Sequence, residues 1–137
     1  MAIQNIFVVG AGLMGSGIAQ TAMTSGYHVI LNDQRQETLE RAQMGIESRL
    51  KHMVEKGTMS EEEFQDCMGR LKIDTRLSAA READLVVEAI FENLEAKQAV
   101  FRQLEEICPD HTIFASNTSS ISLTALAAAT KRPSRVV

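Results

Sequence analysis

Glycines at positions 10, 12 and 15 follow an apolar run and precede apolar residues at helical spacing. The pattern G-x-G-x-x-G between a strand and a helix is typical of loops that bind the diphosphate of a dinucleotide. Gly10 permits a tight turn, Gly12 leaves the backbone open to the diphosphate, and Gly15 lets the helix approach the strand. The amides at the helix N-terminus favour an anion. We predict a cofactor-binding loop that also includes Leu13 and Met14.

A carboxylate stands where a dinucleotide site needs one. Asp33 follows a second apolar run, eighteen positions after Gly15. A carboxylate about twenty residues beyond the glycine loop accepts hydrogen bonds from the adenosine ribose. It also repels a 2′-phosphate, which favours NAD over NADP. Arg35 is either a side chain that accommodates such a phosphate or, more simply, a solvated residue at a helix start.

The composition excludes several classes of protein. The chain has 137 residues and a net charge of −4, so neither nucleic acid nor an anionic membrane is expected as a partner. No signal peptide and no apolar stretch long enough to cross a bilayer are present, which predicts a cytoplasmic protein. Cys67 and Cys108 lack the spacing of a metal site. They are expected to be buried free thiols.

Alternating strand and helix patterns predict the elements that position these residues. Uninterrupted apolar positions after Asp84 predict a strand buried on both faces of a parallel sheet. The expected fold is α/β, a Rossmann-type doubly wound parallel sheet with a helical hairpin inserted between strands 2 and 3, in one domain over residues 1–137. The expected strands are 6–9, 27–31, 71–73, 84–89, 112–115 and 135–137, and the expected helices are 13–23, 34–55, 60–68, 94–107 and 122–129.

The helical hairpin, residues 34–68, is longer than a crossover between neighbouring strands requires. Ser60 and Glu63 have the spacing of a capping box and predict where its second helix begins. The hairpin is either an amphipathic pair that covers the sheet or an arm that reaches a bulky ligand. Ligands bind at the carboxyl ends of parallel strands. The loops 89–93 and 116–119 are therefore expected to face the ligand together with the glycine loop.

The assembled motifs resemble those of a known family. They are Val-Gly-Ala-Gly-Leu-Met-Gly-Ser-Gly-Ile-Ala, the Asn-Asp after the second strand, Leu-Val-Val-Glu-Ala-Ile-Phe-Glu-Asn-Leu with Lys97, and Phe-Ala-Ser-Asn-Thr-Ser-Ser. The whole chain resembles the NAD-binding half of the L-3-hydroxyacyl-CoA dehydrogenase family. The family's reaction is hydride transfer between C3 of a 3-hydroxyacyl-CoA and NAD, in fatty-acid β-oxidation or butanoate metabolism.

The resemblance implies further site residues. Ala89, Glu92 and Lys97 would line the cofactor site, with Lys97 near the nicotinamide-side ribose. Asn117 and Ser119 would lie beside the nicotinamide. Ser119 would be catalytic, donating a hydrogen bond to the substrate's 3-oxygen as charge develops there.

Coenzyme A contacts are also implied by the resemblance, and they favour the arm interpretation of the hairpin. Lys56 matches a family lysine that contacts coenzyme A. Arg49 stands where the family has a contact serine.

The family's catalytic histidine, its glutamate partner and its helical dimerisation domain would lie beyond Val137. A general base must lie within hydrogen-bond reach of the substrate hydroxyl. His28, His52 and His111 are expected to lie away from the cleft. The chain alone is therefore expected to bind NAD with negligible turnover, and the full-length parent to be a dimer. The alternatives are a regulatory module that senses NAD, another β-hydroxyacid dehydrogenase, or a catalytically dead paralogue with a structural role.

Overall fold

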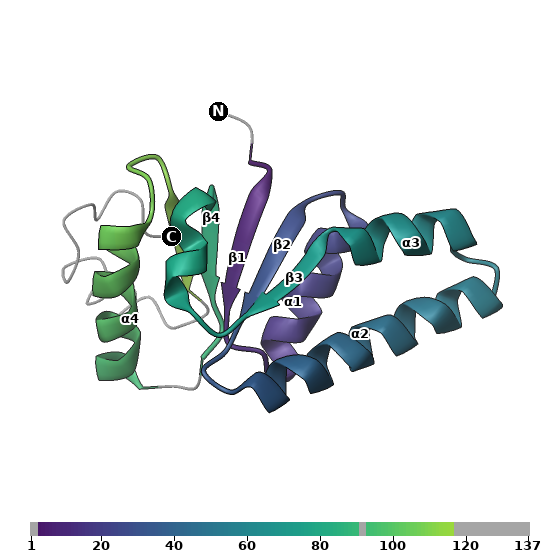
Figure 1. The fold of residues 1–137 in the computed structure, drawn as a ribbon, viewed down its shortest axis with the longest axis horizontal. Helices are drawn as coiled ribbons and strands as arrows, with labels where there is room; N and C mark the ends of the chain where they lie inside the picture. The colour runs from purple at the N-terminus through teal and green to yellow at the C-terminus, as the bar shows by residue number, and fades with distance from the viewer. Residues whose placement is uncertain (1–2, 91–92, 117–137) are drawn as a thin grey trace.

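The described part of the protein is built on a sheet of five parallel strands (Figure 1). The computed structural model describes residues 3–90 and 93–116. The strands lie in the order β3-β2-β1-β4-β5, so the direction of the crossovers reverses between β1 and β4. The predicted doubly wound parallel sheet is therefore confirmed. The strands are β1 (Asn5–Val9), β2 (His28–Asn32), β3 (Leu71–Asp74), β4 (Leu85–Glu88) and β5 (Ile113–Ser116).

Helices cover both faces of this sheet. The predicted hairpin connects β2 to β3, and Figure 1 shows it extending beyond the edge of the sheet. One face packs against α1 (Leu13–Thr24), α2 (Gln36–Glu55) and α3 (Glu61–Gly69). The opposite face packs against the 3-10 helix η1 (Leu77–Glu82) and α4 (Leu94–Ile107).

The central strand β1 supplies side chains to both cores. Ile6 and Val8 point into the core beneath α1 and α2, whereas Phe7 and Val9 point into the core beneath η1 and α4. This alternation follows from the period of two along a strand. Four consecutive residues of β1 are buried, so packing on both faces positions its carboxyl end at the start of the glycine loop.

The start of α3 confirms the predicted capping box. The Ser60 hydroxyl accepts a hydrogen bond from the Glu63 amide at 3.0 Å, and the Ser60 amide donates to the Glu63 carboxylate at 3.3 Å. Two helix-terminal or cap amides are thereby satisfied by side chains of the same turn. The hairpin tip between α2 and α3 is thus defined by local sequence.

Three large apolar residues that recur at helical spacing in the sequence are exposed in the structure. Leu13 and Met14 are 91% and 53% exposed, and they line an open depression of the described structure together with Val87 of β4. Met44 of α2 is 71% exposed. It lies off the stripe formed by the buried residues of α2, which recur at helical spacing.

Strand β4 is less covered than its sequence predicts. Val86 and Glu88 are buried, but Leu85 and Val87 are only half-buried. These two side chains line an open, mainly apolar depression beside α1. Helix α4 lies over the other face of β4, so the described residues bury this strand fully on one side only.

Other expectations have mixed outcomes. Cys67 and Cys108 are buried free thiols, as predicted. The 3-10 helix η1 was not expected from the sequence. Within residues 3–90 and 93–116, no helix combines the length and apolar character needed to cross a membrane. The helix expected at 122–129 and the strand expected at 135–137 lie outside the described residues.

Candidate cofactor site

The predicted glycine loop and the predicted residue Ala89 lie side by side where the crossovers reverse direction. The carboxyl end of β1 leads into Gly10, and the carboxyl end of β4 leads into Ala89. The Ala89 amide donates to the Val9 carbonyl at 2.8 Å, so the two loops begin side by side. In open α/β sheets this switch point is where ligands bind.

Two of the three glycines are required by the shape of the loop. Gly10 has φ of +105°, and a Cβ there would lie 2.7 Å from the Ala89 carbonyl oxygen. A Cβ on Gly15 would overlap the Gly10 carbonyl oxygen. The Gly10 amide donates to the Asn32 carbonyl at 2.8 Å, which fastens the turn to the end of β2. The predicted turn at Gly10 and the close approach at Gly15 are both present.

Gly12 has a different environment. A Cβ there would have no protein atom within 4 Å, and its extended backbone suits any residue. It is the N-cap of α1 and provides no side-chain cap. The described fold would therefore tolerate a side chain at position 12. Because Gly12 has none, the start of α1 remains open.

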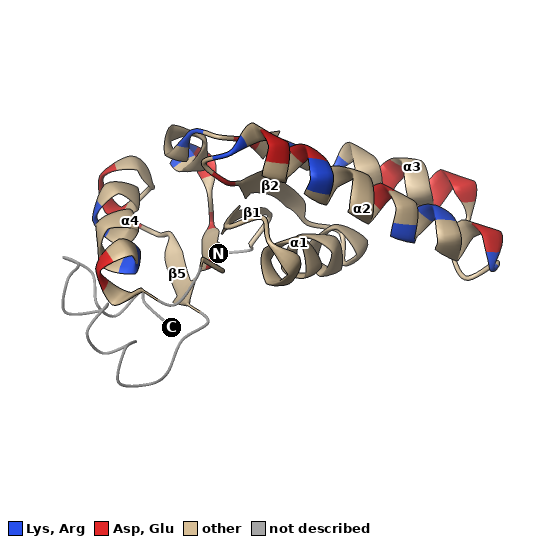
Figure 2. Ribbon diagram, turned by 90° about the horizontal axis from the view of Figure 1, so that it is seen from below, with Lys and Arg blue, Asp and Glu red and all other residues tan. Residues whose placement is uncertain are grey.

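The N-terminus of α1 is electrostatically distinct from those of the other helices. It has neither a side-chain cap nor an acidic residue in its first turn. Each of the other α-helices in the described ranges has at least one acidic residue there. Figure 2 shows no charged residue along α1, whereas α2 and α4 carry residues of both signs and α3 carries acidic residues. The positive end of the α1 dipole is thus left for an anion.

Asp33 lies between the glycine loop and α2. Its Oδ2 accepts from the Ala11 amide at 3.0 Å, and its Oδ1 accepts from the Arg35 amide at 3.1 Å. A carboxylate has about four acceptor positions, so two remain for further donors such as ribose hydroxyls. The same side chain therefore fixes the glycine loop and offers acceptors beside it.

A buried ionic network lies beneath the loop after β4. Glu88 is fully buried, and Lys97 of α4 is 1% exposed with its Nζ 3.0 Å from Glu88 Oε1. The Ser116 hydroxyl donates to the same oxygen at 2.6 Å, and the Ile90 amide donates to Oε2 at 2.7 Å. These contacts join the carboxyl ends of β4 and β5 to the first turn of α4.

Sequence reasoning missed the role of Glu88, although two signals pointed to it. An acidic residue ends an otherwise apolar buried strand, and Lys97 occupies a position that shares the inner face of α4 with Phe101 and Leu104. A charge in such a position requires a partner. Lys97 was predicted to line the cofactor site, and its ammonium lies in the interior against Glu88.

The other predicted site residues lie either beside the glycine loop or outside the described residues. Leu13 and Met14 begin α1 beside the glycine loop, and Ala89 lies against Gly10. Glu92, Asn117 and Ser119 lie outside the described residues.

Lys56 lies far from the glycine loop, at the tip of the hairpin. It is the exposed C-cap residue of α2. A helix of twenty residues is about 30 Å long, so the hairpin places Lys56 well beyond the sheet. Arg49 lies nearer and donates to the Gln20 side chain of α1 at 2.6 Å. Arg49 therefore braces the hairpin against α1.

The histidines lie away from the carboxyl edge of the sheet. His28 begins β2, where it pairs with Asn5 at the amino edge. His52 is in the last turn of α2, on the exposed surface. The Nε2 of His111 lies 2.9 Å from Asp84 Oδ1, just before β5. Each lies outside the cleft, as the sequence predicts.

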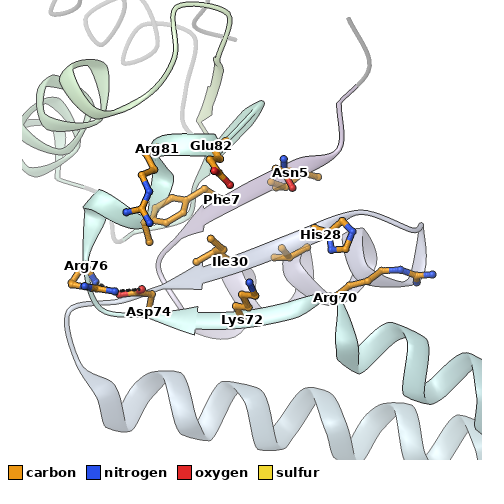
Figure 3. A pocket seen from close by; sticks show the side chains of 14 residues that line it. Asn5, Phe7, His28, Ile30, Arg70, Lys72, Asp74, Arg76, Arg81 and Glu82 are labelled. Carbon is orange, nitrogen blue, oxygen red and sulfur yellow. Dashed lines mark hydrogen bonds and ion pairs between the residues drawn. The ribbon is translucent and has the colours of Figure 1, made fainter.

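A hollow of about 300 Å³ lies elsewhere, on the sheet face bordered by η1 (Figure 3). Phe7 and Ile30 form part of its floor, and Lys72, Arg81 and Glu82 stand around it. Its lining contains none of the glycine-loop residues and neither Asp33 nor Glu88. This hollow is therefore separate from the residues predicted to bind the cofactor, which lie at the carboxyl ends of the strands.

Residues 5–137 match the family model for "3-hydroxyacyl-CoA dehydrogenase, NAD binding domain". The chain is 46% identical over its full length to a probable 3-hydroxybutyryl-CoA dehydrogenase of Bacillus subtilis, of which it covers 48%. It is 46% identical to the 3-hydroxyadipyl-CoA dehydrogenase of Escherichia coli, with 98% of the chain and 28% of that protein aligned. The chain thus spans about half, or less, of these curated relatives.

A solved structure agrees with the sequence relatives. The crystal structure of 3-hydroxybutyryl-CoA dehydrogenase from Escherichia coli K12 superposes with a TM-score of 0.95 at 45% identity, over 99% of this chain and 29% of that chain. The fold, the glycine loop and the family model therefore agree. The chain belongs to the 3-hydroxyacyl-CoA dehydrogenase family and constitutes its NAD-binding domain.

Proposed function

We propose that this domain serves hydride transfer between NAD and C3 of a 3-hydroxyacyl-CoA. The observation that carries the proposal is the open N-terminus of α1 behind Gly12, which has neither a cap nor an acidic residue. The relatives bear the names of 3-hydroxybutyryl-CoA and 3-hydroxyadipyl-CoA dehydrogenases. Multifunctional proteins of fatty-acid β-oxidation are also among them, which supports that metabolic setting.

The described residues fit a dinucleotide. The backbone from Gly10 to Gly15 would hold the diphosphate on the first amides of α1, where the dipole favours it. The two remaining acceptor positions of Asp33 would take the adenosine ribose hydroxyls. Ala89, adjacent to Gly10, would close the site on the β4 side.

Glu92, Lys97, Asn117 and Ser119 complete the proposed site around the reacting end of the cofactor. Bound NAD supplies a nicotinamide carbon that accepts or returns a hydride. Ser119 would donate a hydrogen bond to the substrate 3-oxygen, where charge develops during the transfer. Lys56, at the tip of the hairpin, would contact coenzyme A. We further propose a cytoplasmic enzyme that is dimeric at full length.

Deprotonation of the 3-hydroxyl needs a base within hydrogen-bond reach. The three histidines of the sequence lie at the amino edge of the sheet or on the hairpin. We therefore propose that these 137 residues bind NAD but turn over negligibly by themselves. A clear dehydrogenase rate from the purified chain would contradict this second statement.

Calorimetric titration with NAD and then NADP tests the cofactor assignment. NAD should bind more tightly than NADP, because Asp33 repels a 2′-phosphate. Gly12→Ala should abolish NAD binding while retaining the fold, since its Cβ meets no protein atom. Gly17→Ala is the matched control, because its Cβ is equally unobstructed but lies further along α1. Equal NAD affinity in the two variants would overturn the proposed diphosphate site.

The alternative is a regulatory module that binds NAD without chemistry. Leu13 and Met14 are exposed beside an apolar depression that includes Val87. Monomeric proteins rarely leave such patches uncovered, so this surface favours a domain that packs on further protein over a self-contained sensor. A purified chain that remains a monodisperse monomer at high concentration would support the sensor instead.

A further inference from the structure

One carboxylate gathers three segments at the carboxyl edge of the sheet. Glu88 Oε1 accepts from Ser116 Oγ at 2.6 Å and from Lys97 Nζ at 3.0 Å. Its Oε2 accepts from the Ile90 amide at 2.7 Å. Ile90 belongs to the loop after β4, Lys97 to α4, and Ser116 is the last residue of β5.

The network is buried and depends on charge. The side chains of Glu88 and Lys97 are 0% and 1% exposed. A buried carboxylate is tolerated when an opposite charge and hydrogen-bond donors surround it. Both carboxylate oxygens of Glu88 face hydrogen-bond donors. The side chain at position 88 therefore has to present an acceptor atom at each of its two ends.

We propose that Glu88 is a positioning residue for the cofactor and substrate site, which it influences by joining Ile90, Lys97 and Ser116 at the carboxyl edge of the sheet. It fixes the Ile90 amide relative to the end of β5, from which the chain continues directly into Asn117 and Ser119. This inference rests on the proposed function, because it concerns the placement of residues around the reacting end of NAD.

Packing alone does not require Glu88 at this edge. The interior between α4 and β5 is already filled by Phe101 and Phe114, whose ring centroids lie 5.7 Å apart. The Glu88 contacts instead end on groups at the carboxyl edge, where the ligand loops begin. At the amino edge of the sheet, a separate hydrogen bond joins the segments that precede β4 and β5: Thr112 Oγ1 donates to the Ala83 carbonyl at 2.6 Å.

These two hydroxyls provide a matched pair of variants. Ser116→Ala removes a 2.6 Å bond at the ligand edge, and Thr112→Val removes a 2.6 Å bond at the opposite edge of the same strand. Urea unfolding and NAD titration of the full chain then separate stability from binding. Both variants should lose stability, but only Ser116→Ala should raise the Kd for NAD, by about threefold to tenfold.

Glu88→Gln is a stronger perturbation than Ser116→Ala, although the glutamine side chain has nearly the same size as that of glutamate. The glutamine amide places its NH₂ group toward either the Ile90 amide or the Ser116 and Lys97 donors, so a donor meets a donor in both orientations. The Kd for NAD should rise about tenfold or more in the folded variant. Ser116→Thr keeps the hydroxyl and should restore a Kd near that of the wild type.

The outcomes discriminate clearly. Equal Kd values for wild type, Ser116→Ala and Thr112→Val would make the network merely structural and overturn the inference. This comparison remains decisive if Glu88→Gln does not fold. Failure of the wild-type chain to bind NAD would instead refute the proposed cofactor function, and the inference with it.

Discussion

The buried pair between Lys97 and Glu88 predicts a large loss of stability when Lys97 is replaced by methionine. The charged atoms lie 3.0 Å apart, with side-chain exposures of 1% and 0%. At an effective dielectric constant of about 20, their attraction is about 5 kcal/mol. Methionine fills most of the space but leaves the carboxylate buried without its counter-charge. We expect the free energy of unfolding to fall by about 3–5 kcal/mol, which is much of a typical total of about 5–15 kcal/mol.

Urea unfolding followed by far-ultraviolet circular dichroism measures this loss. The matched control is Lys51→Met, because Lys51 Nζ lies 2.9 Å from Glu47 Oε1 but the two side chains are 59% and 42% exposed. An exposed helical pair of this kind contributes only about 0.3–0.5 kcal/mol. The comparison therefore keeps the ion-pair distance nearly constant and changes the burial.

A double-mutant cycle with Glu88→Gln tests whether the loss comes from the pair itself. Removing both charges should cost about 2 kcal/mol less than the sum of the single losses, since no uncompensated charge remains. Additive losses, or equal losses for Lys97→Met and Lys51→Met, would refute the argument that burial makes this ion pair important.

Further predictions concern the strand ends and the hairpin. Backbone hydrogen bonds from Asn5 and Gln4 hold the pKa of Asp84 below its ordinary value of 3.8. Asp84 therefore stabilises the fold above that pH, and its contribution is lost as the pH falls through the lowered pKa. The stability gap between wild type and Asp84→Asn, measured by urea unfolding, should therefore narrow from about pH 6 to about pH 3; a constant gap would contradict this. Gly10→Ala should cost about 2 kcal/mol or more, because of its φ of +105° and the Ala89 carbonyl, and a thermal midpoint equal to that of Gly12→Ala would argue against the loop geometry. Ser60→Ala should lower the free energy of unfolding in urea by about 1 kcal/mol, whereas Ser60→Thr should keep most of the stability that the cap provides. Equal losses in the two variants would show that the hydroxyl cap contributes little.

Much of the fold was predictable because local signals agreed with one another. Ser60 and Glu63 correctly predict the start of α3, and the apolar stripe of α4 predicts its bounds of Leu94–Ile107. The 3-10 helix η1 was missed, because a helix of six residues has too few turns for a periodic pattern. Leu13 and Met14 follow the helical period but are exposed, and sequence spacing alone does not tell which apolar positions other elements cover.

The site was predictable only where backbone geometry requires a particular residue. Gly10 and Gly15 follow from the close approach of two backbones, and that requirement is visible in the sequence. The contact between Glu88 and Ser116 could not be predicted from the sequence. The two residues lie on different strands, and their contact depends on the register that pairs β4 with β5. Contacts of this kind become visible only when the sheet is assembled.

The charges at the carboxyl edge predict that Lys97 affects the binding of an anionic ligand from the interior of the domain. Glu88 lies in the strand that borders the glycine loop, and an unpaired carboxylate there would oppose a diphosphate on the first turn of α1. The ammonium of Lys97 cancels that charge at 3.0 Å, while Asp33 remains as the acceptor on the β2 side. Lys97→Met should therefore weaken NAD binding under conditions in which the variant is fully folded, and Lys51→Met should not. Unchanged NAD affinity in folded Lys97→Met would show that the buried charge does not reach the ligand site.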